Sequence, residues 1–316
     1  IGAAVEIEQD DPLEIVYQHS LFCQVALPRR RPEGRIFERA YRNGSVRIEA
    51  SALWDGYKWI DQPIPAGPKP RLALCHLNSE AVKTRCPVVE VDRSARKFME
   101  RLGLNTDGGS TYNLFKREMK ALAACRMTLG FGDKEHPVTV DAKPIRRFEA
   151  WLAYDGGQPT LWPGVIELSR EYFDSLLEHA VPLDPRAVSA LAHSAMALDV
   201  YSFLARRLYT LEKPVKVTWR QFQGQFGQEY TGQNALKDFV REFLIALRVA
   251  LVVYPSAKVE QIRGGLLLKP SLPPVHRESV AVSHGLAGQV RASLPAPPPI
   301  KNLAPATVDQ FRKLYP

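Results

Sequence analysis

Runs of β-branched and aromatic residues mark the first part of the chain as strand-forming. The segments 15–27, 34–41 and 45–53 are of this kind, and Pro or Gly turns separate them. A Pro-rich loop at 62–70 follows. The pattern predicts a β-rich N-terminal part over residues 1–68.

Longer segments of helical character begin after this loop. Helices are predicted over 71–85, 93–104 and 110–125, with a strand at 86–91 between the first two and strands at 126–131, 136–142, 145–154 and 160–168 after the third. The turn 155–159 (DGGQP) joins the last two strands. From residue 169 the pattern predicts helices over 169–180, 185–194 and 195–209, a strand over 213–219, helices over 220–227 and 233–251, and a hairpin over 258–270.

A repeat appears when the two halves are aligned with an offset of 124 residues. The matched pairs are Phe98 with Phe222, Gly103 with Gly227, Phe115 with Phe239, Arg117 with Arg241, Glu118 with Glu242, and Met119 with Phe243. Helix, strand, helix, turn, helix and hairpin is the element order of a winged helix-turn-helix. The predicted fold is therefore α+β, with a β-rich part (1–68), tandem winged helix-turn-helix domains (69–168 and 169–270) and a Pro-rich tail (271–316).

The charge balance favours a polyanionic partner. Among the 316 residues, Lys and Arg outnumber Asp and Glu by 42 to 34, which gives a net charge of +8. Residues 28–47 alone hold seven arginines and two glutamates. Net charge alone does not distinguish such a protein from the alternative, a basic enzyme without a nucleic-acid partner.

Other classes of protein find little support in the sequence. The four cysteines and seven histidines are scattered and match no zinc or HExxH spacing, so we expect no metal site and reduced cysteines. No GxxxxGK[ST] loop is present, and we expect neither a cofactor nor catalysis. Without a membrane-spanning run or a signal peptide, a cytoplasmic protein with no membrane partner is expected.

The segment 110–125 predicts a helix with a chemical face for DNA. At 100° per residue, Phe115, Met119 and Leu122 share the core side, whereas the opposite arc carries cations and small hydrogen-bonding side chains. Cations bind phosphate or guanine and Asn pairs with adenine, and the Gly108-Gly109 turn lets a duplex approach the helix start. The residues expected to contact DNA here are Gly109, Ser110, Thr111, Asn113, Lys116, Arg117 and Lys120.

The helix 233–251 repeats this arrangement less cleanly, with Asp238 at the edge of its outer face. Amide-rich residues before it suit base edges, although plain polar loops share that composition. The expected contacts are Arg220, Gln221, Gln233, Asn234, Lys237 and Arg241, together with the wing residues Arg146, Arg147, Lys258 and Arg263. For both helices, a solvated basic face remains the alternative interpretation.

Several long stretches also resemble one family, the plasmid-encoded RepA replication initiators of bacteria. The similar stretches are PAGPKPRLALCHLNSEAVKTRCPVVEV, FMERLGLNTDGGSTYNLFKREMKAL, HAVPLDPRAVSALAHSAMALDVYSFLARRL, and KPVKVTWRQFQGQFGQEY through VVYPSAKVEQIRGGLLLKPS. The resemblance implies binding to repeated origin sequences (iterons), origin opening, winged-helix domains, and host replication proteins such as an initiator and a helicase as partners. It also implies a homodimer as one form. A transcriptional repressor with the same fold and a scaffold that binds no DNA are the alternatives.

Overall fold

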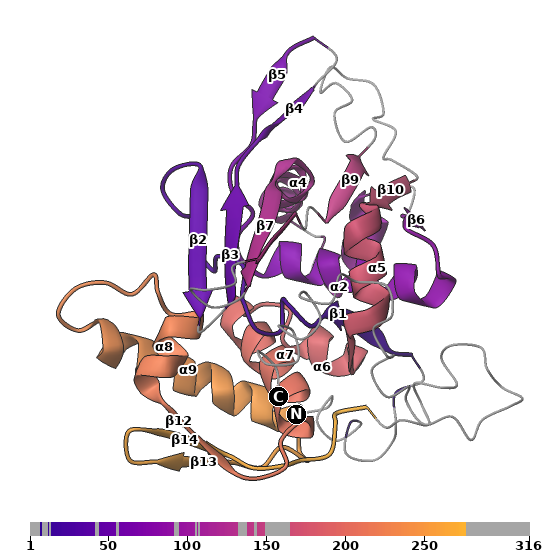
Figure 1. Cartoon of the computed structure of the whole chain (residues 1–316). Coiled ribbons are helices and arrows are strands. Elements are labelled where there is room, and N and C mark those ends of the chain that lie inside the picture. The colour runs from indigo at the N-terminus through magenta and orange to yellow at the C-terminus, as the bar shows by residue number, and fades with distance from the viewer. Residues whose placement is uncertain are drawn as a thin grey trace, which may run out of the picture.

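The structure is a computed structural model that describes most of the chain up to residue 275. It describes residues 7, 12, 14–41, 44–54, 57–91, 95–104, 106, 108–131, 138–141, 144–148 and 165–275. The predicted turn 155–159 and nearly all of the predicted tail 271–316 lie outside these ranges. Within them the fold is a mixed α+β arrangement of helices and several small sheets, as predicted at that level (Figure 1).

Two segments of the chain, which we call runs, contain helices and strands in the same order, and they correspond to the two halves of the predicted repeat. The first run is α2 (Pro68–Thr84), β6 (Val88–Glu90), α3 (Ala95–Arg101), α4 (Gly109–Ala124), β9 (Ile145–Phe148) and β10 (Val165–Leu168). The second run is α7 (Ala195–Tyr209), β12 (Val215–Thr218), α8 (Trp219–Phe226), α9 (Ala235–Val252), β13 (Val259–Ile262) and β14 (Gly265–Leu268). Both runs form a three-stranded antiparallel sheet in which the last strand is central, β6-β10-β9 and β12-β14-β13.

An extra pair of strands separates α4 from the hairpin of the first run. β7 (Arg126–Phe131) and β8 (Val138–Asp141) join β2 (Ile36–Tyr41) and β3 (Gly44–Glu49) in a sheet of order β2-β3-β7-β8. A separate hairpin of β4 (Ala52–Trp54) and β5 (Trp59–Asp61) projects above this sheet in Figure 1. The predicted domain boundary at residue 68 therefore divides a sheet, since β3 pairs with β7, a strand that follows α4.

The prediction of one strand over 15–27 is wrong beyond its first part. The strand β1 ends early, at Val16–His19, and pairs with β11 (Ala180–Leu183), a strand that the sequence analysis missed. After it the backbone turns, with Val25 N–H donating to Leu21 C=O at 2.8 Å. Leu21, Phe22 and Cys23 are all buried, although a strand can send only alternate side chains to one face. A turn buries all three.

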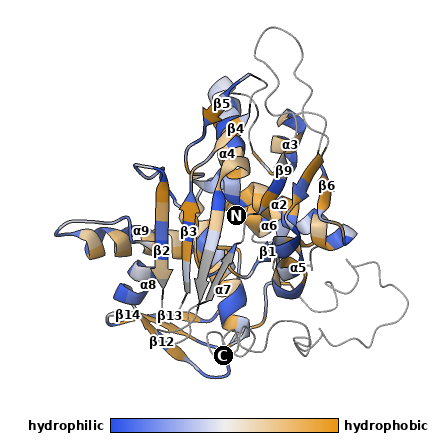
Figure 2. Ribbon diagram, turned by 45° about the horizontal axis from the view of Figure 1, so that its top comes forward, coloured by the Kyte–Doolittle hydropathy of each residue, from blue (hydrophilic) through white to orange (hydrophobic). Residues whose placement is uncertain are grey.

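The cores of the two runs are built from equivalent aromatic residues. Phe98 and Phe115 are fully buried with ring centroids 5.9 Å apart. Their matched residues, Phe222 and Phe239, are also fully buried and both pack on Phe243, at 4.8 and 5.3 Å. Apolar residues are concentrated where α2 crosses the middle of the molecule (Figure 2). The helices α5 (Arg170–His179) and α6 (Pro185–Ala190) connect the two runs. In the part of the chain that the structure describes, no helix is both long and apolar enough to span a bilayer.

A buried ion pair joins the first helices of the two runs. Arg71 on α2 donates from Nε and Nη2 to the two carboxylate oxygens of Asp199 on α7, at 2.7 and 2.8 Å. Both side chains are almost fully buried. The same guanidinium donates to the carbonyls of Leu27, Pro28 and Gly67, so all of these segments meet at one cation.

A second buried polar cluster centres on His19 at the end of β1. Leu21 N–H donates to His19 Nδ1 at 3.1 Å, and His19 Nε2 lies 3.1 Å from Ser175 Oγ. Since Nδ1 accepts, the proton of the neutral ring is on Nε2. Complete burial, and to a smaller extent the nearby His179, lower the pKa of His19 to about 3.

Gly227 ends α8 at a point where no side chain fits. A Cβ atom there would lie 2.3 Å from Cδ2 of the fully buried Phe239. We expect Gly227→Ala to lower the free energy of unfolding by about 1–3 kcal/mol, because the ring or the backbone must shift. Urea denaturation measures this.

The matched control is Gly109→Ala at the start of α4. A Cβ atom at this position meets nothing within 4 Å. Because alanine is the better helix former, this variant should be neutral or more stable than the wild type. Equal effects of the two substitutions would contradict the close packing at Gly227.

Candidate nucleic-acid interface

The helix α4 presents the predicted polar face to solvent. Phe115, Met119 and Leu122 are fully buried on the opposite side. Gly109, Ser110, Asn113 and Arg117 are exposed, whereas Thr111, Lys116 and Lys120 are half-buried. The N-cap residue is Gly108, and no side chain makes a capping hydrogen bond to the helix start. Its backbone N–H groups therefore have no capping side chain to compete with an anion.

Lys116 and Arg117 of this face each contact another side chain of the same helix. Lys116 Nζ lies 5.4 Å from the ring centroid of Tyr112, and Arg117 Nη2 lies 3.6 Å from Glu118 Oε1. Glu118 is itself buried, so it adds no acid to the exposed face, as the helical arc predicts. The face can therefore offer cations and small polar groups to a phosphate or a base edge.

The helix α9 presents its equivalent face over its first half. Gln233, Asn234, Lys237 and Arg241 are exposed, and Arg241 Nη2 lies 3.1 Å from Asp238 Oδ1. The second half of the outer face differs from the prediction. Alongside Arg248 it exposes Ile245, Val249 and Val252, at 45–56% of their area. Only the N-terminal half of this helix has a polar face suited to DNA.

Gln221 on α8 has a structural task in addition to its predicted one. Its side-chain Oε1 accepts from Thr218 N–H at 2.8 Å, and Thr218 Oγ1 accepts from Gln221 N–H, which together form a capping box. Its oxygen is therefore engaged, and only the amide NH₂ group could meet a base edge. The neighbouring Arg220 is exposed.

The predicted wing residues lie on the two equivalent hairpins. Arg146 on β9 is exposed and pairs with Glu167 on β10 at 3.2 Å. The side chain of Arg147 lies outside what the structure describes. Lys258 and Arg263 are exposed on either side of β13, and Gly264, with φ 83°, makes the turn after it. These hairpins place cations beside, but not on, the two long helices.

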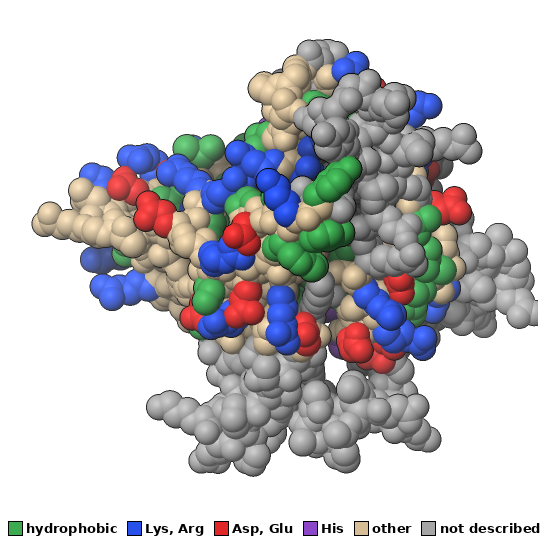
Figure 3. Space-filling model, turned by 90° about the horizontal axis from the view of Figure 1, so that it is seen from above, with side chains coloured by type: hydrophobic (Ala, Val, Ile, Leu, Met, Phe, Trp, Pro, Cys, Tyr) green, Lys and Arg blue, Asp and Glu red, His purple; other side chains and the backbone are tan. Residues whose placement is uncertain are grey.

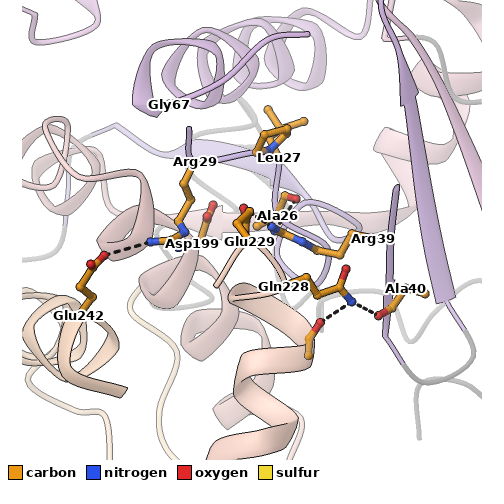
Figure 4. Close-up of polar contacts among 12 residues, drawn as sticks. Ala26, Leu27, Arg29, Arg39, Ala40, Gly67, Asp199, Gln228, Glu229 and Glu242 are labelled. Atoms are coloured by element: carbon orange, nitrogen blue, oxygen red, sulfur yellow. Dashed lines mark hydrogen bonds and ion pairs between the residues drawn. The ribbon is translucent and has the colours of Figure 1, made fainter. Parts of the chain in front are cut away.

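Sequence reasoning missed a segment that lies between the two helices. Arg29 pairs with Glu242 on α9 at 3.6 Å, and Arg31 forms an ion pair with Glu118 on α4. Figure 4 shows Arg29 reaching toward Glu242, with Arg39 and Glu229 close by. Two signals could have identified it, namely the unbroken arginine run at 29–31 and the offset that matches Glu118 with Glu242.

One face of the molecule carries a marked group of cations. In the view of Figure 3, Lys and Arg side chains form a band from the left edge, where α8 and α9 lie in Figure 1, to the centre. A few Asp and Glu side chains interrupt it. Such a band is the electrostatic pattern that a polyanion would use.

Comparison with known proteins identifies the family. The family model described as "Plasmid encoded RepA protein" matches residues 64–221. The sequence matches no curated protein. Two crystal structures of domains 2 and 3 of RctB are similar at 10% identity: the selenomethionine derivative covers 80% of this chain and 97% of its own, with a TM-score of 0.49, and the other covers 84% and 98%, with a TM-score of 0.47. The chain belongs to the plasmid-encoded RepA family of replication initiators.

Proposed function

We propose that this protein initiates plasmid replication by binding repeated origin sequences in double-stranded DNA, with α4 and α9 as recognition helices of two winged-helix repeats. Binding at these iterons would promote local opening of the origin and recruit host replication proteins such as an initiator and a helicase. The observation that carries the proposal is the equivalence of α4 and α9. Each follows a short helix in a run of the same order. Each also exposes a polar, basic face, and the arginines Arg117 and Arg241 on these faces are matched by the 124-residue offset of the repeat.

The contacts of the arginine segment support a single duplex on both helices. Glu118 and Glu242 directly follow the predicted DNA-binding residues Arg117 and Arg241, and they pair with Arg31 and Arg29. Two residues of extended chain span at most about 7 Å. The flanks of α4 and α9 that carry these glutamates therefore lie on either side of one short segment, each within reach of one arginine side chain. We infer that one duplex can lie across both helices, which would then occupy successive major grooves.

Selection of bound fragments from a random DNA pool at near-physiological salt tests the proposal. We expect enrichment of two half-sites separated by about one helical turn, and a footprint on the order of 20 bp. The logarithm of the affinity should fall steeply with the logarithm of the salt concentration, by about 0.9 for each phosphate neutralised. Absence of DNA affinity at low salt would favour the scaffold alternative. A single enriched operator without repeats would favour a repressor.

Substitution of the two equivalent arginines tests the helices separately. Arg117→Ala and Arg241→Ala should each cost about 1–3 kcal/mol of binding free energy and relax the base preference at one position of their own half-site. Arg170→Ala on α5 is the control, since this arginine is exposed and outside the predicted interface. Equal weakening on all DNA sequences would assign the arginine to a phosphate instead.

A further inference from the structure

The arginine bridge, which we define as Arg29, Arg30 and Arg31, is held at both ends by the two candidate recognition helices. Arg31 forms an ion pair with the buried Glu118, whose other oxygen accepts from Ala66 N–H at 2.9 Å. At the other end, Arg29 pairs with Glu242 and stacks on Tyr230, with the guanidinium carbon 4.9 Å from the ring centroid. The Tyr230 hydroxyl donates to the same Glu242. The outer two arginines are therefore fixed on α4 and α9.

The backbone that enters the bridge is anchored as well. Gly67 N–H donates to the Pro28 carbonyl at 3.0 Å, and the buried Arg71 donates to the carbonyls of Leu27 and Pro28. Polar contacts within the protein thus hold the chain on both sides of Arg30. These contacts reduce the conformational entropy that Arg30 would lose on binding a ligand.

Arg30 differs from its two neighbours. Both Arg30 and Arg31 are exposed, but among the described residues no carboxylate forms an ion pair with Arg30. Its flanking arginines each meet a carboxylate one position after a predicted DNA-binding arginine. Arg30 is consequently an exposed cation on an anchored backbone, between the residue that pairs with α9 and the residue that pairs with α4.

We propose that Arg30 enters the DNA minor groove between the two half-sites. This inference rests on the proposed function. When two helices occupy successive major grooves on one side of a duplex, the intervening minor groove faces the protein between them. A narrow minor groove of A·T base pairs has an enhanced negative potential that attracts an inserted arginine. The expected ligand is therefore an A·T-rich spacer between the half-sites.

The test compares spacers in otherwise identical DNA. Duplexes with the two selected half-sites receive a spacer of A·T, G·C or inosine·C pairs. Inosine lacks the guanine N2 amino group, so an I·C pair resembles A·T in the minor groove and G·C in the major groove. Wild-type protein should bind the A·T and I·C spacers about tenfold more tightly than the G·C spacer. Arg30→Ala should lose this preference while keeping the base preferences within the half-sites.

Controls separate the possible outcomes. Arg170→Ala should keep the spacer preference, and the thermal midpoint of Arg30→Ala should equal that of the wild type because the side chain is exposed. If Arg30→Ala weakens binding to all three spacers equally, Arg30 contacts a phosphate and the proposal is overturned. Unchanged spacer discrimination in Arg30→Ala overturns it too. If the wild type binds no DNA from the pool, the proposed function fails as well.

Discussion

Asp199→Ala is expected to lower the free energy of unfolding by about 3–5 kcal/mol, because it leaves the buried Arg71 guanidinium without its counterion. The two side chains are 5% and 6% exposed and share two hydrogen bonds, so water cannot replace the lost carboxylate without opening the structure. The remaining acceptors of Arg71 are neutral carbonyls. Chemical denaturation followed by far-UV circular dichroism measures the loss.

The matched control removes the same residue type from a surface pair. Asp174→Ala breaks the contact between Asp174 and Arg170 on α5, and both of these side chains are largely exposed. This pair joins residues four positions apart on one helix, and its loss should cost about 0.5 kcal/mol or less. Similar losses for the two variants would show that solvent reaches Asp199 in the native state.

Acid should destabilise the fold through His19. The folded-state pKa of about 3 lies below the ordinary value of 6.5, so the unfolded chain takes up the proton first as the pH falls. The stability that the neutral ring contributes is complete above pH 6.5 and is lost progressively as the pH falls toward 3. At about pH 4.5 we expect His19 to account for a loss of about 3 kcal/mol.

His19→Asn isolates this contribution. An Asn Oδ1 can take the place of Nδ1 and accept from Leu21 N–H, but it does not titrate. The variant should be less stable than the wild type at neutral pH, since it loses the ring stacked on Tyr172 at 5.3 Å. Its stability should fall less between neutral and acidic pH. His193→Asn, at an exposed position, should follow the wild-type pH profile. Identical profiles for His19→Asn and the wild type would show that His19 is not the group responsible.

Local patterns predicted the elements that have strong periodicity. The long helices α2, α4, α7 and α9 fall within a few residues of their expected bounds, because each has a continuous apolar side. The strand β11 was missed because its residues AVPL directly follow α5 and include a proline, a poor residue for a strand interior. The boundary at residue 68 failed to anticipate the β3–β7 pairing, for which no local pattern exists.

In the candidate site, too, local patterns predicted the helix faces but not the contacts between distant segments. The polar face of α4 follows from its helical period: Gly109, Ser110, Asn113 and Arg117 are exposed, while Thr111, Lys116 and Lys120 are half-buried and none of the seven is buried. Whether these residues contact DNA stays a prediction. The arginine bridge could not be anticipated, since Arg31 and Arg29 meet glutamates 87 and 213 positions away (118 − 31 and 242 − 29). Charge density marks such a run as basic but does not identify its partners.

The pairing of β1 with β11 affects how the protein folds during translation. Val16 leaves the ribosome early, but its partner Leu183 follows only after all of the first run has been made. At about 5–20 residues per second, on the order of ten seconds separate the two strands. Throughout that interval the backbone groups of β1 lack their partner strand, so the nascent chain exposes an unsatisfied edge to which a chaperone or a second nascent chain could bind.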